Sequence, residues 1–309
     1  MTDAIVLDGL FKSHGAVPAV RGLSLSVPAG TICGLIGPDG AGKTTAMRIL
    51  CGLLRADRGA ASVLGHDCAN AARAVKQHLG YMPQRFSLYP DLTVAENLRF
   101  FADLYGVPAA ERRQRDAELM AFSRLEPFRG RRAGQLSGGM KQKLALSCTL
   151  IHTPAVLILD EPTTGVDPVS RREFWRILRD LAGRGLALLV STPYMDEAAL
   201  CDDVVLMHAG RALAQGAPVA VAASFPRRLL EVTGIDPAAA GRRLCEAAVA
   251  GLDVQRYGDR LHLMYDDQAQ AAAAARALAG TGAVLTPLAA GIEDVFVDMM
   301  ARADAEAAS

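Results

Sequence analysis

The chain has 309 residues, which suffices for one large domain or for a large domain with a smaller companion. Its 33 basic and 33 acidic side chains give a formal net charge of zero, so the basic excess typical of nucleic-acid-binding proteins is missing. Apolar residues make up 51% of the sequence, yet no stretch reaches the roughly 18 apolar residues of a membrane span. The N-terminus, MTDAIVLDGL, has no basic start followed by an apolar run. We therefore expect a cytoplasmic protein with a sizeable core, no signal peptide and no nucleic-acid partner.

Strands alternate with helices along the first two thirds of the sequence. Hydrophobic periodicity predicts strands at residues 5–11, 23–27, 31–36, 79–83, 156–160 and 186–191, and a hairpin of 204–208 with 211–215. It predicts helices at residues 43–54, 171–182 and 195–201. This alternation is typical of a mainly parallel sheet that binds ligands at the carboxyl ends of its strands. Residues 86–148 are mostly helical, with a capping box at Thr93–Glu96, and are expected to form a helical subdomain.

The order of elements changes after residues 216–226. Strands are predicted at 229–233, 254–257, 261–265 and 284–287, and helices at 237–249, 268–278 and 292–300. The first six of these elements follow the βαββαβ order of a ferredoxin-like unit. We therefore expect a domain at 1–220 and a small α+β domain at 226–303, with a frayed tail after Met300.

The segment 37–44 matches the phosphate-binding pattern G-x-x-x-x-G-K-[ST] and lies between a predicted strand and a predicted helix. Its residues are Gly37, Pro38, Asp39, Gly40, Ala41, Gly42, Lys43 and Thr44. Glycines let backbone N–H groups surround a phosphate, and the helix N-terminus adds partial positive charge. Lys43 can reach the β- and γ-phosphates, the Thr44 hydroxyl can ligate Mg²⁺, and Thr45 can contact the α-phosphate. An ordinary glycine-rich turn is the alternative, but the strand–loop–helix context favours ATP with Mg²⁺.

Two carboxylates end the apolar segment 156–161, VLILDE. Asp160, at the strand end, can hold Mg²⁺ through water, while Glu161 can orient or deprotonate the attacking water. A strand followed by a polar turn would explain the pair if it stood alone. Because a phosphate loop accompanies it, we assign catalysis to Glu161 and metal binding to Asp160 and Thr44.

The segment 136–142, LSGGMKQ, resembles the LSGGQ signature of ABC transporter ATPases and has Met140 in the fifth place. The resemblance covers residues 4 to about 216 and implies the ABC type of P-loop fold. It also implies that Ser137, Gly138 and Gly139 cover the γ-phosphate of ATP held by a second ATPase domain. Gln84 then matches the loop that contacts Mg²⁺ and water, and Asp167 matches the loop at the dimer interface.

Longer stretches are similar to bacterial exporters of the ABC-2 type. They are YMPQRFSLYPDLTVAENL, GQLSGGMKQKLALSCTL and IEDVFVDMM. Drug-efflux pumps with two tandem ATPase domains resemble this chain most, in their N-terminal half. The resemblance implies ATP hydrolysis that drives a separate transmembrane permease at the cytoplasmic face of the bacterial inner membrane. Residues 85–92, with Phe86, Leu88 and Tyr89, are expected to receive a coupling helix of that permease, although internal packing would explain these three side chains equally well.

Two positions depart from the family pattern. Pro193 stands where the family has its switch histidine, and proline has no side-chain donor for a γ-phosphate. His14 stands where an aromatic ring stacks on adenine, and imidazole offers less area. Neutral variation at residue 193 and a solvated residue 14 are the alternatives. Because Glu161 and the signature are intact, we expect a chain that hydrolyses ATP slowly and pairs with a different ATPase chain rather than with a copy of itself.

Three functions other than export are compatible with an ATP-binding loop, and other sequence features bear on each of them. A soluble ABC-type ATPase acting on ribosomes or DNA would show a second ATPase half, a long coiled coil or a basic linker, which this sequence lacks. A regulatory ATP-binding module is favoured by Pro193 and disfavoured by Glu161. A P-loop kinase would have no use for segment 136–142 or for Gln84.

Overall fold

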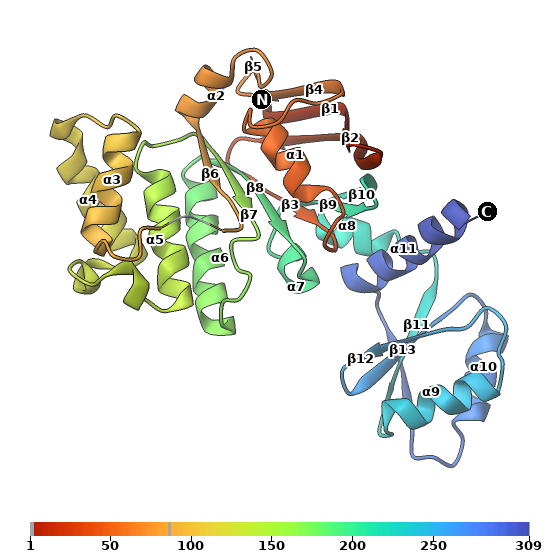
Figure 1. Cartoon of the computed structure of the whole chain (residues 1–309). Coiled ribbons are helices and arrows are strands. Elements are labelled where there is room, and N and C mark those ends of the chain that lie inside the picture. The colour runs from red at the N-terminus through yellow and green to blue at the C-terminus, as the bar shows by residue number, and fades with distance from the viewer. Residues whose placement is uncertain (1–2, 86–87, 309) are drawn as a thin grey trace. The chain divides into compact units, whose positions relative to one another are not determined.

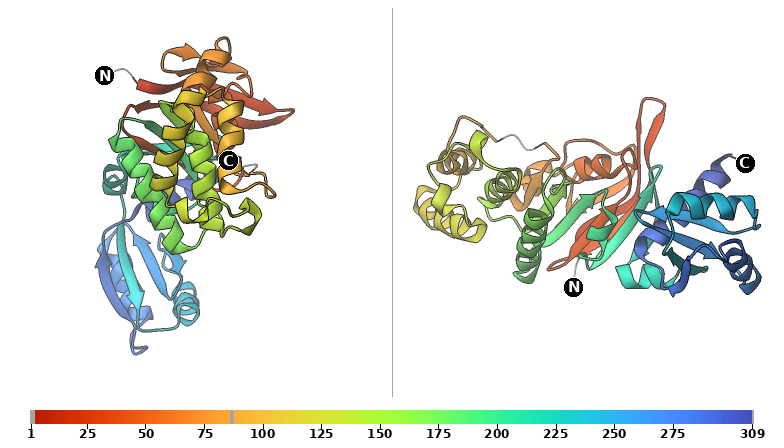
Figure 2. Two further views of the ribbon diagram at one scale, coloured as in Figure 1. Left: turned by 90° about the vertical axis from the view of Figure 1, so that its left-hand side faces the viewer. Right: turned by 90° about the horizontal axis from the view of Figure 1, so that it is seen from below.

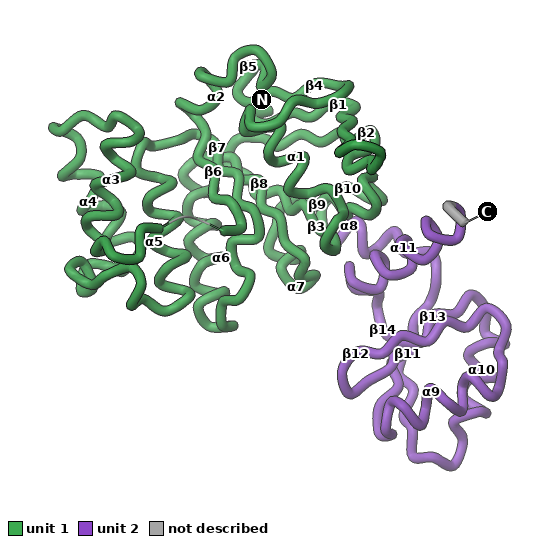
Figure 3. The backbone as a smooth tube through the Cα atoms, viewed as in Figure 1, with its two compact units in different colours: residues 1–218 green, residues 219–309 purple. Residues whose placement is uncertain are grey.

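The computed structural model describes residues 3–85 and 88–308. It divides into two compact units, Met1–Pro218 and Val219–Ser309, which are coloured separately in Figure 3. Each unit has its own buried apolar clusters. None of the helices in the described part of the chain is long and apolar enough to cross a bilayer.

Two sheets form the body of the first unit (Figure 1). The outer sheet is antiparallel, in the order β2-β1-β4-β5. The core sheet has the order β10-β9-β3-β8-β7-β6 and is parallel except for β10. The bounds are β1 Asp3–His14, β2 Val17–Pro28, β3 Ile32–Ile36, β4 Arg58–Val63, β5 His66–Asp67, β6 Leu79–Met82, β7 Val156–Asp160, β8 Ala187–Thr192, β9 Asp203–His208 and β10 Arg211–Gly216. Because β3, β7 and β8 are buried along their whole length, they consist almost entirely of apolar residues.

Helices cover both faces of the core sheet. Helix α1 (Lys43–Leu50) packs against β2, β4 and β7 and shares one apolar cluster with both sheets. Helix α6 (Pro168–Gly183) packs on β3 and β8 through an apolar stripe that includes Phe174 and Leu178. The shorter helices of this unit are α2 (Ala72–His78), α7 (Met195–Ala198) and α8 (Pro218–Ala223), the last of which continues into the second unit.

Three helices form a subdomain at one end of the first unit, drawn in yellow to green in Figure 2. They are α3 (Val94–Leu104), α4 (Ala109–Ser123) and α5 (Gly138–Leu150), joined by the 3-10 turns Glu126–Phe128 and Ala133–Gln135. The capping box predicted at Thr93 is confirmed: its side chain accepts a hydrogen bond from the Glu96 N–H, and the Glu96 carboxylate accepts one from the Thr93 N–H. A separate apolar cluster holds the three helices together.

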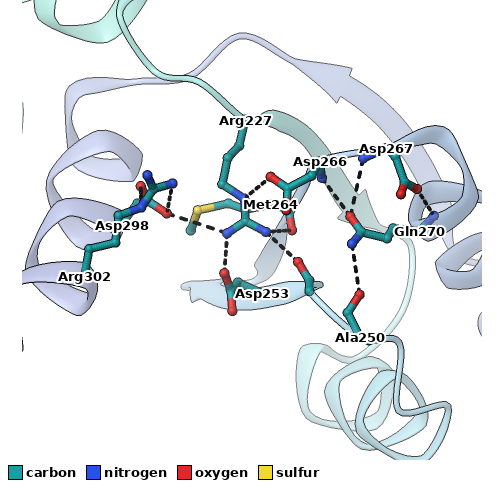
Figure 4. A network of polar contacts seen from close by, with 10 residues as sticks. Arg227, Ala250, Asp253, Met264, Asp266, Asp267, Gln270, Asp298 and Arg302 are labelled. Carbon is teal, nitrogen blue, oxygen red and sulfur yellow. Dashed lines mark hydrogen bonds and ion pairs between the residues drawn. The ribbon is translucent and has the colours of Figure 1, made fainter. Parts of the chain in front are cut away.

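The second unit is an antiparallel sheet, in the order β12-β13-β11-β14, with helices beside it. Its elements are β11 Arg228–Thr233, α9 Pro237–Glu246, β12 Asp253–Tyr257, β13 Arg260–Tyr265, α10 Gln268–Ala277, β14 Val284–Leu288 and α11 Ile292–Ala308. The βαββαβ order and the sheet order are those of a ferredoxin-like unit. Arg227 directly precedes β11, has a side chain that is 6% exposed, and contacts Asp253, Asp266 and Asp298 (Figure 4).

The fold class expected from the sequence is confirmed, but several element boundaries were wrong. Helix α1 ends at Leu50 rather than at residue 54, because Gly52 adopts a left-handed φ of 63° and closes the helix. Helix α11 continues to Ala308, so the predicted fraying after Met300 is not found. The strands Arg58–Val63 and His66–Asp67 and the helix Ala72–His78 were not predicted at all.

Candidate functional site

The loop between β3 and α1 has a backbone that two of its glycines make possible. A Cβ on Gly37 would lie 2.3 Å from the Met207 carbonyl oxygen, and one on Gly42 would lie 2.2 Å from the Ala19 carbonyl oxygen. Gly42 also has a φ of 102°, which side chains with a Cβ rarely adopt. The loop therefore passes close to two other strands before it opens into the first turn of α1, whose N–H groups are free for an anion.

Lys43 and Thr44 begin α1 and face the loop. Lys43 is 4% exposed, and its ammonium group donates to the carbonyl oxygens of Gly37 and Pro38 at 2.7 and 2.9 Å. These bonds hold the charge inside the curl of the loop, where a phosphate would meet it. The Thr44 hydroxyl donates to Asp160 Oδ1 at 3.1 Å.

The acid pair lies at the carboxyl end of β7, as the sequence predicted. Asp160 is 1% exposed and Glu161 is 6% exposed. Ser191, on the neighbouring strand β8, donates its hydroxyl to Asp160 Oδ1 at 2.7 Å and accepts the Glu161 N–H at 3.0 Å. The structure therefore brings together the Asp160 carboxylate and the Thr44 hydroxyl, oxygen groups of the kind that Mg²⁺ prefers.

Glu161 turns away from Asp160 and is held by three side chains. Its backbone φ of 48° is left-handed, so its carboxylate points to a different side of the strand end. The Gln84 amide donates to Glu161 Oε2 at 2.8 Å, the Thr164 hydroxyl donates to the same oxygen at 3.2 Å, and Lys43 Nζ lies 3.6 Å from Oε1. The sequence had identified Gln84 and Lys43 as site residues but not Thr164. The sequence feature that could have indicated Thr164 is its position three residues after Glu161.

Some of these groups line one pocket of about 410 Å³, within the range of small-molecule sites, whereas Asp160, Thr164 and Ser191 do not line it. Its lining residues are His14, Ala19, Asp39, Gly40, Ala41, Gly42, Lys43, Thr44, Thr45, Gln84 and Glu161. His14 is the exposed last residue of β1, and its Nε2 lies 3.3 Å from the Thr45 hydroxyl. The imidazole therefore stands at the rim of the pocket, where it can face a bound ligand.

Ser137, Gly138 and Gly139 do not line this pocket. Ser137 caps α5 by accepting the Met140 N–H at 3.3 Å. Gly139 packs so closely on Ser170 that a Cβ would lie 2.5 Å from the serine Cβ. The exposed residues Ser137 and Gly138 therefore present a helix N-terminus that contributes nothing to the pocket of its own chain.

Asp167 is the N-cap of α6, the helix whose Ser170 packs against Gly139 of that helix N-terminus. Its carboxylate accepts the N–H groups of Val169 and Ser170 at 3.1 and 2.9 Å. Hydrogen bonds from Ser170 and Val169 hold the pKa of the Asp167 carboxyl below its usual value. Asp167 is exposed and does not line the nucleotide pocket.

Residue 193 follows β8 directly and precedes helix α7. Pro193 is half-buried and is absent from the lining of the pocket. The next residues are anchored: Arg171 of α6 stacks on the Tyr194 ring at 4.5 Å and pairs with Asp196 at 3.3 Å, and Thr163 donates to Glu197 at 2.8 Å. The segment is thus held in place without any donor from residue 193.

Comparison with known proteins identifies the family. Residues 20–164 match the family model described as ABC transporter. The chain is 44% identical, over 230 residues, to the Nod factor export ATP-binding protein I of Burkholderia orbicola, covering 74% of this chain and 76% of that protein. This chain belongs to the ATP-binding proteins of ABC transporters. Membership of this family implies that the chain binds ATP.

Other ABC proteins show how far the likeness extends. The chain is 50% identical over 252 residues to the "Probable multidrug ABC transporter ATP-binding protein YbhF" of Escherichia coli, which covers 81% of this chain but 43% of that protein. The chain thus spans less than half the length of that relative. A solved ATP-binding subunit of an ABC transporter matches with a TM-score of 0.65 and 30% identity, over 72% of this chain and 93% of that one.

The expected socket for a coupling helix is only partly described. Phe86 lies outside the described residues. Leu88 packs against the apolar cluster of the helical subdomain, whereas Tyr89 is 44% exposed and its ring meets Phe100 edge to face. A larger groove, of about 880 Å³, lies elsewhere between α2 and the turn from α3 to α4.

Proposed function

We propose that this chain is the ATP-hydrolysing subunit of an ABC exporter and that it energises a separate membrane subunit. The observation that carries the proposal is the Thr44–Asp160 bond of 3.1 Å beside the Gln84–Glu161 bond of 2.8 Å, both facing one phosphate loop. Nucleotide hydrolysis needs a metal-binding group next to the phosphates and a carboxylate near the attacking water, and this arrangement supplies both. Residues 1–220 would carry this activity, with 86–148 as the part that meets the membrane subunit.

Mg²⁺ would be held by Thr44 and, through water, by Asp160, with Gln84 in reach of the metal and the water. A metal held by these residues would supply positive charge that offsets the negative charge developing on the phosphates during transfer. Lys43 would leave the carbonyl groups of Gly37 and Pro38 to contact the phosphates. Glu161 would then orient or accept a proton from the water.

The second ATPase domain supplies what this pocket lacks. Because Ser137, Gly138 and Gly139 do not line the pocket of their own chain, they would complete the pocket of a partner, and the partner's signature would complete this one. Pro193 has no donor for the γ-phosphate, so turnover at this site is slow. A slow site gains most from a partner with a full motif set, which favours a heterodimer over two copies of this chain.

Besides the expected socket at residues 85–92, the membrane subunit would contact the groove between α2 and the turn from α3 to α4. Arg73 and Lys76 make one side of the groove basic, Arg115 pairs with Glu111 within it, and Leu104, which is 64% exposed, also lines it. A short amphipathic helix with an acidic face would satisfy both the charges and the apolar side chain. The chain would thereby be peripheral at the cytoplasmic face of a bacterial inner membrane. The proposed substrate class is drugs or other hydrophobic compounds, and the likeness to the probable multidrug protein YbhF supports it.

A regulatory ATP-binding module is the second candidate, and Pro193 is the observation that favours it. The network of Gln84, Thr164 and Lys43 around Glu161 argues against it, because a site that never hydrolyses ATP has no use for a precisely held carboxylate. Co-purification separates the two functions. We expect a membrane protein and a second ATPase chain to accompany this chain in equal amounts, whereas isolation without any membrane protein would contradict export.

A further inference from the structure

Ser191 is a buried hydroxyl placed between the two acids of the site. It lies on β8, is 0% exposed, and pairs in register with Asp160 of the adjacent parallel strand β7. Its hydroxyl donates to Asp160 Oδ1 at 2.7 Å and accepts the Glu161 N–H at 3.0 Å. One side chain therefore contacts both the metal-binding acid and the backbone of the catalytic acid.

The bond to Asp160 fixes which carboxylate oxygen faces the ligand. The hydroxyls of Ser191 and Thr44 both donate to Oδ1, at 2.7 and 3.1 Å. Two donors on Oδ1 hold the carboxylate plane in one orientation, and neither of them bonds Oδ2. An acid oriented in advance loses less freedom when a metal-bound water arrives.

The bond to Glu161 supports an unfavourable backbone conformation. Glu161 has a φ of 48°, which is costly for a residue with a Cβ, and its N–H is bonded to the Ser191 hydroxyl at 3.0 Å and to the Ser191 carbonyl at 3.2 Å. This left-handed turn carries the Glu161 carboxylate away from Asp160 and towards Gln84. Ser191 thus anchors the point at which the two acids diverge.

We propose that Ser191 is a positioning residue for the metal in the MgATP site. It presets the Asp160 carboxylate for Mg²⁺ and steadies the turn that separates Glu161 from it. The inference rests on the proposed function, since it assumes that the pocket binds ATP with Mg²⁺. If Ser191 served only to stabilise the fold, its loss would weaken ATP binding to the same extent with and without Mg²⁺.

The test measures ATP affinity by equilibrium binding of a fluorescent ATP analogue, once with Mg²⁺ and once with EDTA. In Ser191→Ala, the Glu161 N–H still donates to the backbone carbonyl of residue 191, and Asp160 still accepts the Thr44 hydroxyl. The site therefore loses only one hydroxyl group. We expect the gain in affinity that Mg²⁺ brings to fall about tenfold, with the affinity in EDTA unchanged within about twofold. Ser191→Cys, which keeps a weak donor of similar size, should lose less.

The matched control is Ser147→Ala, since Ser147 is 1% exposed and bonds only the Lys143 carbonyl of its own helix. It should leave both affinities unchanged. The inference is overturned if Ser191→Ala keeps the full Mg²⁺ gain, if both affinities fall together, or if the wild-type chain binds ATP equally well in EDTA. Absence of ATP binding by the wild-type chain under both conditions would instead overturn the proposed function itself.

Discussion

Lys43 Nζ lies 3.6 Å from Glu161 Oε1, and both side chains are almost fully buried, at 4% and 7% exposure. The cation that would bind phosphate is therefore already next to the carboxylate that would act on water. A γ-phosphate entering the pocket would share Lys43 with Glu161 and would meet a negative charge. Binding and catalysis thus make opposite demands on residue 161.

Glu161→Gln is expected to tighten ATP binding while it stops hydrolysis. Removing one negative charge about 4 Å from the phosphates is worth on the order of 1.4 kcal/mol, or about tenfold in Kd. Isothermal titration would measure the Kd, and phosphate release the turnover. Glu173→Gln is the control, because Glu173 pairs with Lys143 away from the pocket. Weaker ATP binding by Glu161→Gln would contradict the charge argument.

Pro193→His is expected to raise turnover. A histidine at this position can donate to the γ-phosphate, whereas proline cannot, and one positioned donor or base commonly changes rates by roughly 100-fold. We expect a rise of about tenfold or more in kcat, with ATP affinity changed less than about threefold. Steady-state ATPase assays on the purified chain would show it. Fast hydrolysis by the wild-type chain that the substitution leaves unchanged would refute the slow-site account.

Leu104→Glu is expected to weaken capture of the membrane subunit without changing ATP affinity. Leu104 is 64% exposed and lines the groove between α2 and the turn from α3 to α4, so the fold tolerates a charge there, whereas a docked apolar helix would not. Quantitative co-purification should recover about a tenth of the partner. Leu53→Glu, at a position that is 56% exposed and outside the groove, should recover as much partner as the wild-type chain. Equal recovery by both variants would move the docking site elsewhere.

Arg227→Ala is expected to destabilise the second unit by about 1–3 kcal/mol, because the Gly251 and Met264 carbonyls lose their guanidinium donor, while the buried Asp298 carboxylate keeps its ion pair with Arg302 at 2.9 Å. Hydrogen exchange across residues 228–265 would measure the change in that unit alone. Arg260→Ala is the control: its side chain is 53% exposed, so loss of its pair with Glu231 should cost less than about 1 kcal/mol. Similar protection in both variants would show that the cluster in Figure 4 contributes little to stability.

Features that depend on consecutive residues could be predicted from the sequence, whereas features that depend on pairing between distant segments could not. The loop Gly37 to Thr44 and the acid pair could be predicted because their chemistry lies in consecutive residues. The contact of Ser191 with Asp160 could not, because it depends on β8 lying next to β7 in the sheet, 31 positions away in sequence. The strand Arg58–Val63 has the sequence RGAASV, which is rich in small residues of low strand propensity, and it is paired with β1 and β5.

One measurement tests the roles assigned at the site most directly: the equilibrium affinity for ATP with Mg²⁺ of the wild-type chain and of Lys43→Ala. Lys43 is the buried cation of the loop, so its removal should weaken binding about 100-fold, or ~2.7 kcal/mol. Lys143→Ala, which removes a lysine paired with Glu173 outside the pocket, should bind as the wild-type chain does. We predict that the wild-type chain and Lys143→Ala bind ATP saturably and that Lys43→Ala loses this binding. The account would be contradicted if the wild-type chain showed no saturable binding, or if Lys43→Ala bound ATP as tightly as the wild-type chain.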